Sequence, residues 1–162
     1  MAALPPRHYA LTPNLPVLVI TMIKSIQHIT INIVDLAKSV AFYGELLGLP
    51  RLDDVEMDDH VLHYFVLPGG TRLELIEYAQ RTPIACDPLT ARGRFRHIAL
   101  ETNNLDALAE KIPLYGGHIL QPPKYVEKLG FLGMLAEDPN GCELEFTETV
   151  PDGPWYQKQK EI

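Results

Sequence analysis

The stretch HITINIVDLAKSVAFYGELLGL, residues 28–49, decides the fold, because its layout returns as HIALETNNLDALAEKIPLYGG, residues 97–117. Each stretch opens with His-Ile and continues as an alternating strand. An acidic or Asn helix cap and a helical pattern follow. A second pair matches as well: GGTRLELIEY at 69–78 and NGCELEFTET at 140–149 each place a turn before an alternating strand. These matches predict one βαβββ unit written twice.

The spacing within the two halves agrees. Glu74 follows His28 by 46 residues, and Glu145 follows His97 by 48 residues. We therefore expect an α+β fold in which two βαβββ modules form a cupped mixed sheet around a site. The expected organisation is one domain with five parts: an N-terminal extension at 1–24, a first module at 25–80, a linker at 81–93, a second module at 94–150 and a C-terminal tail at 151–162.

Cap and breaker residues support both helices. Asp35 is the expected cap of the first helix, and Gly48 ends its pattern. Asn104 is the expected cap of the second helix, and Pro113 prevents the α-helix from continuing.

Composition narrows the class of protein. A chain of 162 residues suits a single domain, and a net charge of -7 without a basic cluster argues against nucleic acid. Cys86 and Cys142 lack a CxxC spacing, which favours free thiols and a cytoplasmic location. The apolar run at 15–23 is too short to cross a bilayer, so no membrane partner is expected.

Strand alternation separates apolar from polar faces. In the strand that begins at His28, Ile29, Ile31 and Ile33 point one way and form a bed for the helix, while His28 shares the other face with Thr30. Each module thus carries one His on its first strand and one Glu on its last, on the face away from the helices. In the second module, strand parity alone leaves Glu143 and Glu145 as equal candidates.

Two imidazoles and two carboxylates, if they converge, suit a borderline divalent ion: Ni, Zn, Co, Mn or Fe(II). Such N/O ligands with open positions are typical of catalytic sites, whereas structural zinc sites are more often rich in cysteine. A lone strand histidine is usually an ordinary polar residue. The same pair of residue types in register in both halves favours a metal site.

With these residues, the chain resembles the vicinal oxygen chelate superfamily, which includes glyoxalase I, bleomycin-resistance proteins and extradiol dioxygenases, and it is most similar to glyoxalase I-like proteins. The resemblance is carried by HITINIVDLAKSVAFYGELLGL, TRLELIEY, RHIALET and EDPNGCELEF and covers about residues 25–149. It implies a homodimer and one divalent metal ion per site, formed within one chain or across the dimer. The implied ligands are His28, Glu74, His97 and Glu145.

This four-ligand set implies a metal-dependent lyase or isomerase that acts through an enediolate on a small carbonyl or thioester substrate. The metal is the Lewis acid, and the proton is carried by Glu145 or, on the opposite substrate face, by Glu74. Two alternatives stay open. One is an extradiol-type ring-cleaving dioxygenase, favoured by Fe(II) and a Glu74 that lies away from the metal. The other is a metal-free protein that binds a small molecule such as an antibiotic.

Recognition of the substrate is less evident from the sequence. Residues 121–134 are expected to form a loop before the last hairpin. Lys124 and Lys128 are candidates to meet an anionic group, with solvated loop charges as the alternative, and Tyr125 and Phe131 are candidates for a wall of the pocket. Arg72 shares the strand face of Glu74 and is a further candidate for an anionic substrate. The remaining histidines fall outside the repeat register and are expected at the surface: His8, His60, His63 and His118.

Overall fold

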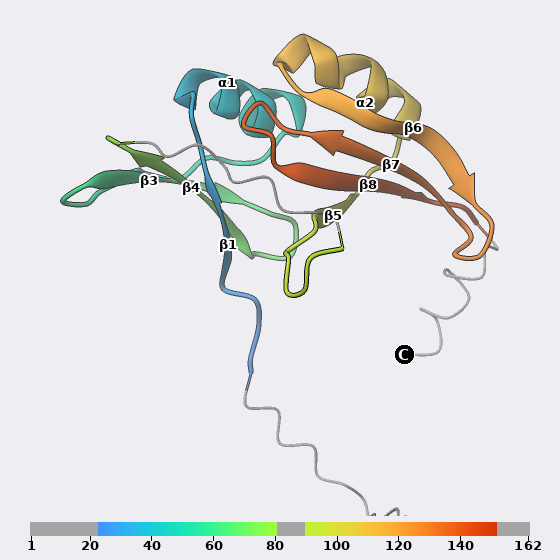
Figure 1. Cartoon of the computed structure of the whole chain (residues 1–162), viewed down its shortest axis with the longest axis horizontal. Helices are drawn as coiled ribbons and strands as arrows, with labels where there is room; N and C mark the ends of the chain where they lie inside the picture. Colours follow the sequence, from blue (N-terminus) through green and yellow to red (C-terminus); the bar gives the residue numbers. More distant parts are fainter. Residues whose placement is uncertain (1–22, 81–89, 152–162) are drawn as a thin grey trace, which may run out of the picture.

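The computed structural model describes residues 23–80 and 90–151 as two βαβββ modules (Figure 1). The first module contains β1 (His28–Asn32), α1 (Leu36–Val40), the π-helical turn η1 (Ala41–Leu46), β2 (Val55–Glu56), β3 (His60–Val66) and β4 (Arg72–Tyr78). The second contains β5 (Ile98–Glu101), α2 (Leu105–Lys111), the 3-10 turn η2 (Ile112–Tyr115), β6 (His118–Val126), β7 (Phe131–Glu137) and β8 (Glu143–Thr149). The α+β class and the two modules are thus confirmed.

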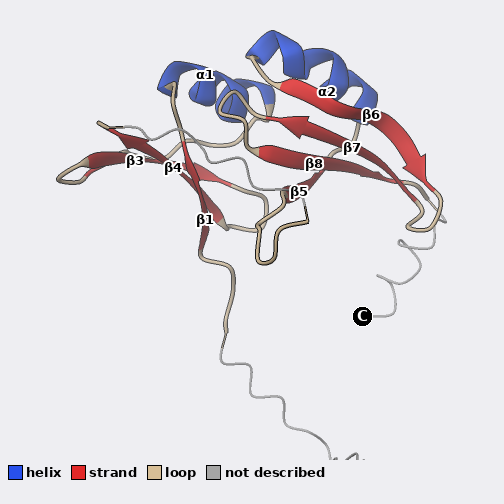
Figure 2. Cartoon of the chain, in the orientation of Figure 1, coloured by secondary structure: helices blue, strands red, loops and turns tan. Residues whose placement is uncertain are grey.

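Each module forms its own four-stranded mixed sheet. The strand orders are β1-β4-β3-β2 and β5-β8-β7-β6, so the two sheets have the same topology. The first strand pairs with the last in parallel, and the other pairs are antiparallel. The helices of the two modules lie on the same side of the sheets (Figure 2). Strands β1 and β5 are therefore equivalent edge strands.

Both helices begin at the predicted caps. The Asp35 carboxylate accepts a hydrogen bond from the Lys38 backbone N–H at 3.1 Å, and the Asn104 side chain accepts one from Ala107 at 2.9 Å. The second helix tightens into η2 at Ile112, next to Pro113, as expected for a residue that cannot continue an α-helix.

One hydrophobic core joins the modules. Ile31 and Ile33 of the first module and Leu144 and Phe146 of the second are buried in it. The predicted helix-facing side of β1 is therefore correct. No helix within residues 23–80 and 90–151 is long and apolar enough to span a membrane.

A buried polar network also joins the modules. Asp138, only 3% exposed, precedes the turn between β7 and β8. Its Oδ2 accepts hydrogen bonds from the Tyr43 hydroxyl and the Asn140 side chain, both at 2.8 Å. Its Oδ1 accepts from the backbone N–H groups of Asn140 and Cys142, also at 2.8 Å. Burial, together with the nearby Asp138 carboxylate, raises the pKa of Tyr43 well above its usual value, so this hydroxyl remains a donor.

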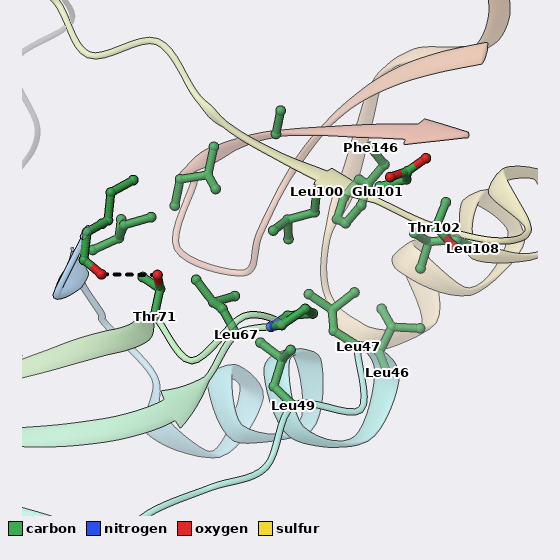
Figure 3. A pocket seen from close by; sticks show the side chains of 15 residues that line it. Leu46, Leu47, Leu49, Leu67, Thr71, Leu100, Glu101, Thr102, Leu108 and Phe146 are labelled. Atoms are coloured by element: carbon green, nitrogen blue, oxygen red, sulfur yellow. Dashed lines mark hydrogen bonds between the residues drawn. The ribbon is translucent and has the colours of Figure 1, made fainter. Parts of the chain in front are cut away.

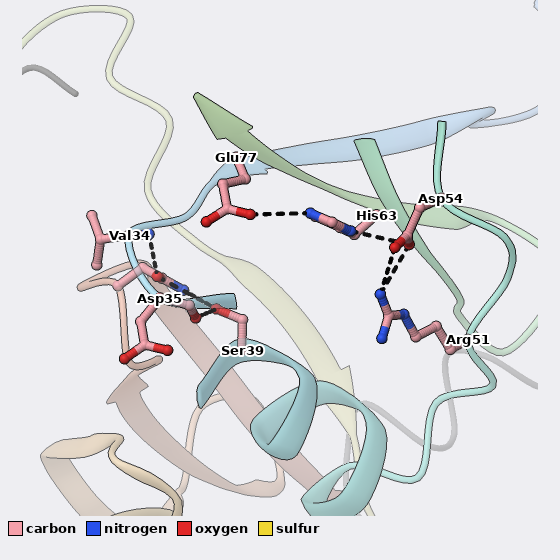
Figure 4. Close-up of polar contacts among 8 residues, drawn as sticks. Val34, Asp35, Ser39, Arg51, Asp54, His63 and Glu77 are labelled. Carbon is pink, nitrogen blue, oxygen red and sulfur yellow. Dashed lines mark hydrogen bonds and ion pairs between the residues drawn. The ribbon is translucent and has the colours of Figure 1, made fainter. Parts of the chain in front are cut away.

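Two sequence predictions are wrong. His63 is not at the surface: it is 2% exposed, because alternation along β3 places it on the face of Phe65 and opposite Leu75. Its Nδ1 lies 3.0 Å from Asp54 and its Nε2 lies 3.6 Å from Glu77, as Figure 4 shows. By contrast, His118 is exposed and the His60 side chain is 18% exposed, while His8 lies outside the described residues.

The predicted loop at 121–134 is mostly strand, since β6 extends to Val126 and β7 begins at Phe131. The pairing of these strands is irregular between Ile119 and Lys124, where Pro122 and Pro123 lie. Because β6 is an edge strand, these prolines can be accommodated there. Most of the predicted extension, linker and tail lies outside the described residues, at 1–22, 81–89 and 152–162.

Gly117 is a point of close approach between the modules, and Gly117→Ala is expected to lower the free energy of unfolding by about 2 kcal/mol. A Cβ there would lie 2.7 Å from Ile112, 2.8 Å from the Glu137 carbonyl oxygen and 2.9 Å from Phe42. The carbonyl belongs to β7 and cannot rotate away, so the strand must shift. Urea unfolding measures the change.

Gly44→Ala is the matched control. Its Cβ would meet only the Phe65 ring, at 3.3 Å, and alanine favours the helical backbone by up to about 1 kcal/mol. Equal losses of stability in the two variants would contradict a specific contact at Gly117.

Candidate metal centre

The two candidate glutamates occupy equivalent positions in the two sheets. Glu74 on β4 lies opposite Thr30 of β1, and Glu145 on β8 lies opposite Ala99 of β5. Thr30 and Ala99 each follow the candidate histidine of their module by two residues. The register therefore makes Glu145, and not Glu143, the counterpart of Glu74.

In the second module a histidine and a glutamate lie together. The Nε2 atom of His97 is 3.1 Å from Oε2 of Glu145, and the two side chains are 30% and 25% exposed. The Nδ1–H of His97 donates to Oε1 of Glu143 at 3.3 Å, and Arg96 donates to the same oxygen at 2.9 Å. This leaves Nε2 of His97 as the atom that faces Glu145.

Glu143 is held as an anion by these contacts. Burial alone would raise the pKa of Glu143, but the hydrogen bonds from Arg96 and His97 outweigh it and lower that pKa below its ordinary value. A carboxylate that accepts from one ring nitrogen fixes the orientation of the imidazole and leaves the other nitrogen for a ligand.

In the first module, Glu74 has a different environment. It is 7% exposed, and both of its oxygens accept hydrogen bonds: Oε1 from the Thr30 hydroxyl at 3.0 Å and Oε2 from the Tyr64 hydroxyl. The hydrogen bond to Glu74 raises the pKa of Tyr64. The Arg72 guanidinium lies over the Tyr64 ring, 5.3 Å from its centroid. His28 is exposed, and its Nδ1 contacts the Gln27 side chain.

The nitrogen and oxygen ligands fit a divalent metal, but within one chain the candidate ligands of the two modules lie apart. Two ligands bound at about 2.1 Å from one ion lie about 3 Å apart; the His97–Glu145 separation of 3.1 Å fits this. Across the described residues, however, no group of three or more His, Cys, Asp or Glu side chains is close enough to hold an ion. A single chain therefore does not bring the four predicted ligands together.

The predicted substrate residues are spread over the fold. Arg72 precedes Glu74 by two residues on the same face of β4. Lys124 and Tyr125 are exposed on β6, and β7 separates that strand from β8. Phe131 begins β7 and is half-buried. The structure thus places Arg72 near a candidate ligand and does not gather the other three around one.

An apolar cavity of about 450 Å³ lies between the modules (Figure 3). Its walls come mainly from the end of η1 and from β5, including Leu46, Leu47, Leu49 and Leu100. None of the four candidate ligands lines it. Ala99, which lies opposite Glu145, does line it, so the cavity borders the candidate metal centre.

Sequence reasoning missed several residues that hold the ligands. Strand alternation places Thr30 on the face of His28 and Glu143 on the face of Glu145. The sequence pattern could therefore have identified these two residues as neighbours of the ligands. Arg96 had only its position next to His97. No sequence feature indicated Tyr64, because its position opposite Glu74 depends on the register between β3 and β4.

Comparison with known proteins agrees with the fold. Residues 25–146 match the model of the Glyoxalase/Bleomycin resistance protein/Dioxygenase superfamily. Lactoylglutathione lyase of Salmonella typhimurium is 25% identical over 128 residues, which cover 78% of this chain and 93% of the relative. The human mitochondrial methylmalonyl-CoA epimerase is 34% identical over 85 residues, 51% of this chain and 48% of the relative.

Among solved structures, the trypanothione-dependent glyoxalase I of Leishmania major superposes with a TM-score of 0.62 at 22% identity. The match covers 85% of this chain and 91% of that one. At this identity the likeness concerns the fold. Because the family match spans most of the chain, including both repeats, this protein belongs to the glyoxalase/bleomycin resistance protein/dioxygenase superfamily.

Proposed function

We propose that this protein is a metal-dependent lyase or isomerase of the glyoxalase I type. It would move a proton on a carbon beside a carbonyl, in a small carbonyl or thioester substrate. The observation that carries the proposal is the His97–Glu145 pair, separated by 3.1 Å, with Glu74 in the equivalent position of the other module. Members of this superfamily usually bind a metal.

We further propose that two copies of the chain complete each centre. Each module offers one His and one Glu, and the described part of a single chain holds no cluster of three ligands. Strands β1 and β5 are edge strands, whose free backbone groups favour pairing with another chain. In a two-fold dimer, the first module of one copy meets the second module of the other, and this contact occurs twice. His28 and Glu74 would then face the partner's counterparts of His97 and Glu145.

The residues divide the chemistry among them. A divalent ion held by the four ligands would supply Lewis-acid stabilisation of the oxyanion that forms when the proton leaves. His97, whose ring is oriented by Glu143, would bind the ion through Nε2. The carboxylate of Glu145 takes the proton from the carbon beside the carbonyl and returns it to the neighbouring carbon. Arg72, on the face of Glu74, would bind an anionic part of the substrate.

Metal binding tests this proposal. Purified protein, stripped and then dialysed separately against Ni, Zn, Co, Mn and Fe(II), is expected to retain about one ion per chain, measured by elemental analysis. Glu74→Ala is expected to lose or weaken that ion, because one of four ligands is removed. Sedimentation of the same samples should give a dimer.

Two outcomes would contradict the proposal. Absence of tight metal in every sample would favour a protein that binds a small molecule without metal. Tight Fe(II) that is unchanged in Glu74→Ala would place Glu74 away from the ion and favour the dioxygenase alternative. As a control, Glu77→Ala changes a glutamate on the same strand that faces His63 instead and should leave the metal content unchanged.

A further inference from the structure

The two candidate histidines have unlike neighbours, although the modules repeat. Glu143 of β8 lies beside His97, with its Oε1 atom 3.3 Å from Nδ1. At the matching position of the first module, His28 pairs with Arg72 of β4. Each of these neighbours precedes the candidate glutamate of its strand by two residues. A carboxylate beside one histidine is thus replaced by a guanidinium beside the other.

The contacts of His97 orient its ring. Its Nδ1–H donates to Glu143, and its Nε2 atom faces Glu145 at 3.1 Å. A carboxylate that accepts from one ring nitrogen fixes the imidazole and directs the other nitrogen to a metal. Nε2 of His97 and the carboxylate of Glu145 are therefore already placed together as a pair of ligands.

Arg96 keeps Glu143 in this position. Glu143 shares its side of the sheet with two like charges, Glu145 two residues further along β8 and Glu137 directly opposite on β7. Like charges in such positions repel each other. The Nη2 atom of Arg96 donates at 2.9 Å to the Glu143 oxygen that accepts from His97, and the Glu143 side chain is only 13% exposed. The guanidinium therefore offsets the repulsion and holds that oxygen against His97.

The first module lacks this arrangement within residues 23–80. A guanidinium carries donors only, so Arg72 cannot accept a hydrogen bond from His28. It lies instead over the Tyr64 ring, 5.3 Å from the centroid. His28 is exposed, and its Nδ1 contacts the side chain of Gln27. Both oxygens of Glu74 accept hydrogen bonds from hydroxyl groups. An ion that binds here would have to orient His28 itself.

We infer that the second module binds the metal ion first, with Arg96 acting through Glu143 as a positioning residue for His97, and that a second copy of the chain then closes its first module over the loaded half. The inference rests on the proposed function, because it assumes a centre shared by two copies. An ion held by the second module favours the dimer, and the dimer favours the ion by the same factor. The supply of metal would therefore control assembly of the dimer.

Arg96→Gln tests the positioning role. It is expected to weaken zinc affinity about 10–100-fold, measured by competition with a chelator. Arg96 donates to Glu143 through a nitrogen that a lysine can replace, so Arg96→Lys should restore most of the affinity. Arg51→Gln is the matched control: Arg51 is exposed to the same degree and pairs with Asp54 in the first module, so its loss should leave zinc affinity unchanged.

NMR of ¹⁵N-labelled histidine gives a readout that a merely structural role would not change. In the zinc-loaded wild type, the Nε2 resonance of His97 should report coordination at that nitrogen. In Arg96→Gln, the spectrum should show a mixture of Nδ1 and Nε2 coordination, because the ring is no longer oriented.

Sedimentation of stripped and zinc-loaded protein measures the order of assembly. The dissociation constant of the wild-type dimer is expected to be at least about tenfold lower with zinc. His28→Ala should keep weak zinc binding through the second module and should reduce this difference, whereas His97→Ala should lose both. Tighter zinc binding in His97→Ala than in His28→Ala would assign the first binding step to the first module and overturn the inference.

The remaining outcomes separate the two proposals. If wild-type protein binds none of the five metals, or the loaded protein does not exchange the C–H protons of dihydroxyacetone in D₂O, the proposed function fails and this inference fails with it. If wild type binds metal and exchanges, but its dimer is equally stable with and without zinc, only the inference is overturned. Wild-type zinc affinity in Arg96→Gln, or an equal loss in Arg51→Gln, would also overturn it alone. Unfolding in urea, run on all variants, identifies any general loss of stability.

Discussion

Glu145→Gln is expected to lower metal-dependent proton exchange of dihydroxyacetone by about 10²–10⁴-fold, the range typical of a lost general base. The amide cannot take up a proton, while its carbonyl oxygen keeps the shape and a ligand atom of the original side chain. The metal content should therefore fall far less than the rate. NMR in D₂O measures the exchange, and elemental analysis of the same samples measures the metal.

Glu148→Gln serves as the control on the same strand. Glu148 accepts a hydrogen bond from the Leu105 backbone N–H at 2.7 Å, on the helix-facing side, and an amide oxygen can accept there too. Its exchange rate should match wild type. An unchanged rate in Glu145→Gln, with metal retained, would remove Glu145 from the mechanism and move the role of base to another residue.

Asp138→Ala is expected to lower the free energy of unfolding by about 3 kcal/mol or more, because it leaves several buried donors without a partner. The Tyr43 hydroxyl, the Asn140 side chain and two backbone N–H groups all donate to this carboxylate. Tyr43 is 1% exposed and has no route to water. Since Tyr43 and Asp138 come from different modules, the loss should appear as weaker docking of the two.

Urea unfolding measures this loss of stability. A milder variant and a control variant are measured beside it. Tyr43→Phe removes one of the hydrogen bonds and should cost about 1 kcal/mol, which keeps the test possible if Asp138→Ala does not fold. Asp53→Ala changes an exposed aspartate and should remain within about 0.5 kcal/mol of wild type. A loss below about 1 kcal/mol in Asp138→Ala would show that the network is not a main link between the modules.

The cysteine beside this network has no catalytic environment. Burial, with the nearby Asp138 and Glu143 carboxylates, raises the pKa of Cys142 to about 12. The thiolate is the reactive form of cysteine, so Cys142 is not a nucleophile at neutral pH.

Local pattern was enough for the architecture. The repeat of His-Ile strand, cap and helix predicted the two modules, and period-two alternation placed Ile31 and Ile33 on the core side of β1. Caps such as Asp35 and Asn104 were visible because a helix start needs a side-chain acceptor within three residues in sequence. These features depend on neighbours along the chain.

Pattern failed where a residue depends on strands distant in sequence. Residues 121–134 were expected to form a loop, yet most of them are strand, and the edge position of β6 accommodates the prolines at 122 and 123. His63 looked like a surface residue, and only the packing of the helix-facing side of β3 buried it beside Asp54 and Glu77.

The sequence by itself determined the superfamily, the two modules and one His and one Glu on the polar face of each. Alternation and repetition encode these features, and both can be seen within short stretches of chain. Only the tertiary structure decided that Glu74 is held by Thr30 and Tyr64 while Glu145 lies between Ala99 and Leu135. The reason is register: hydrogen bonds between strands, not spacing along one strand, determine which side chains face each other.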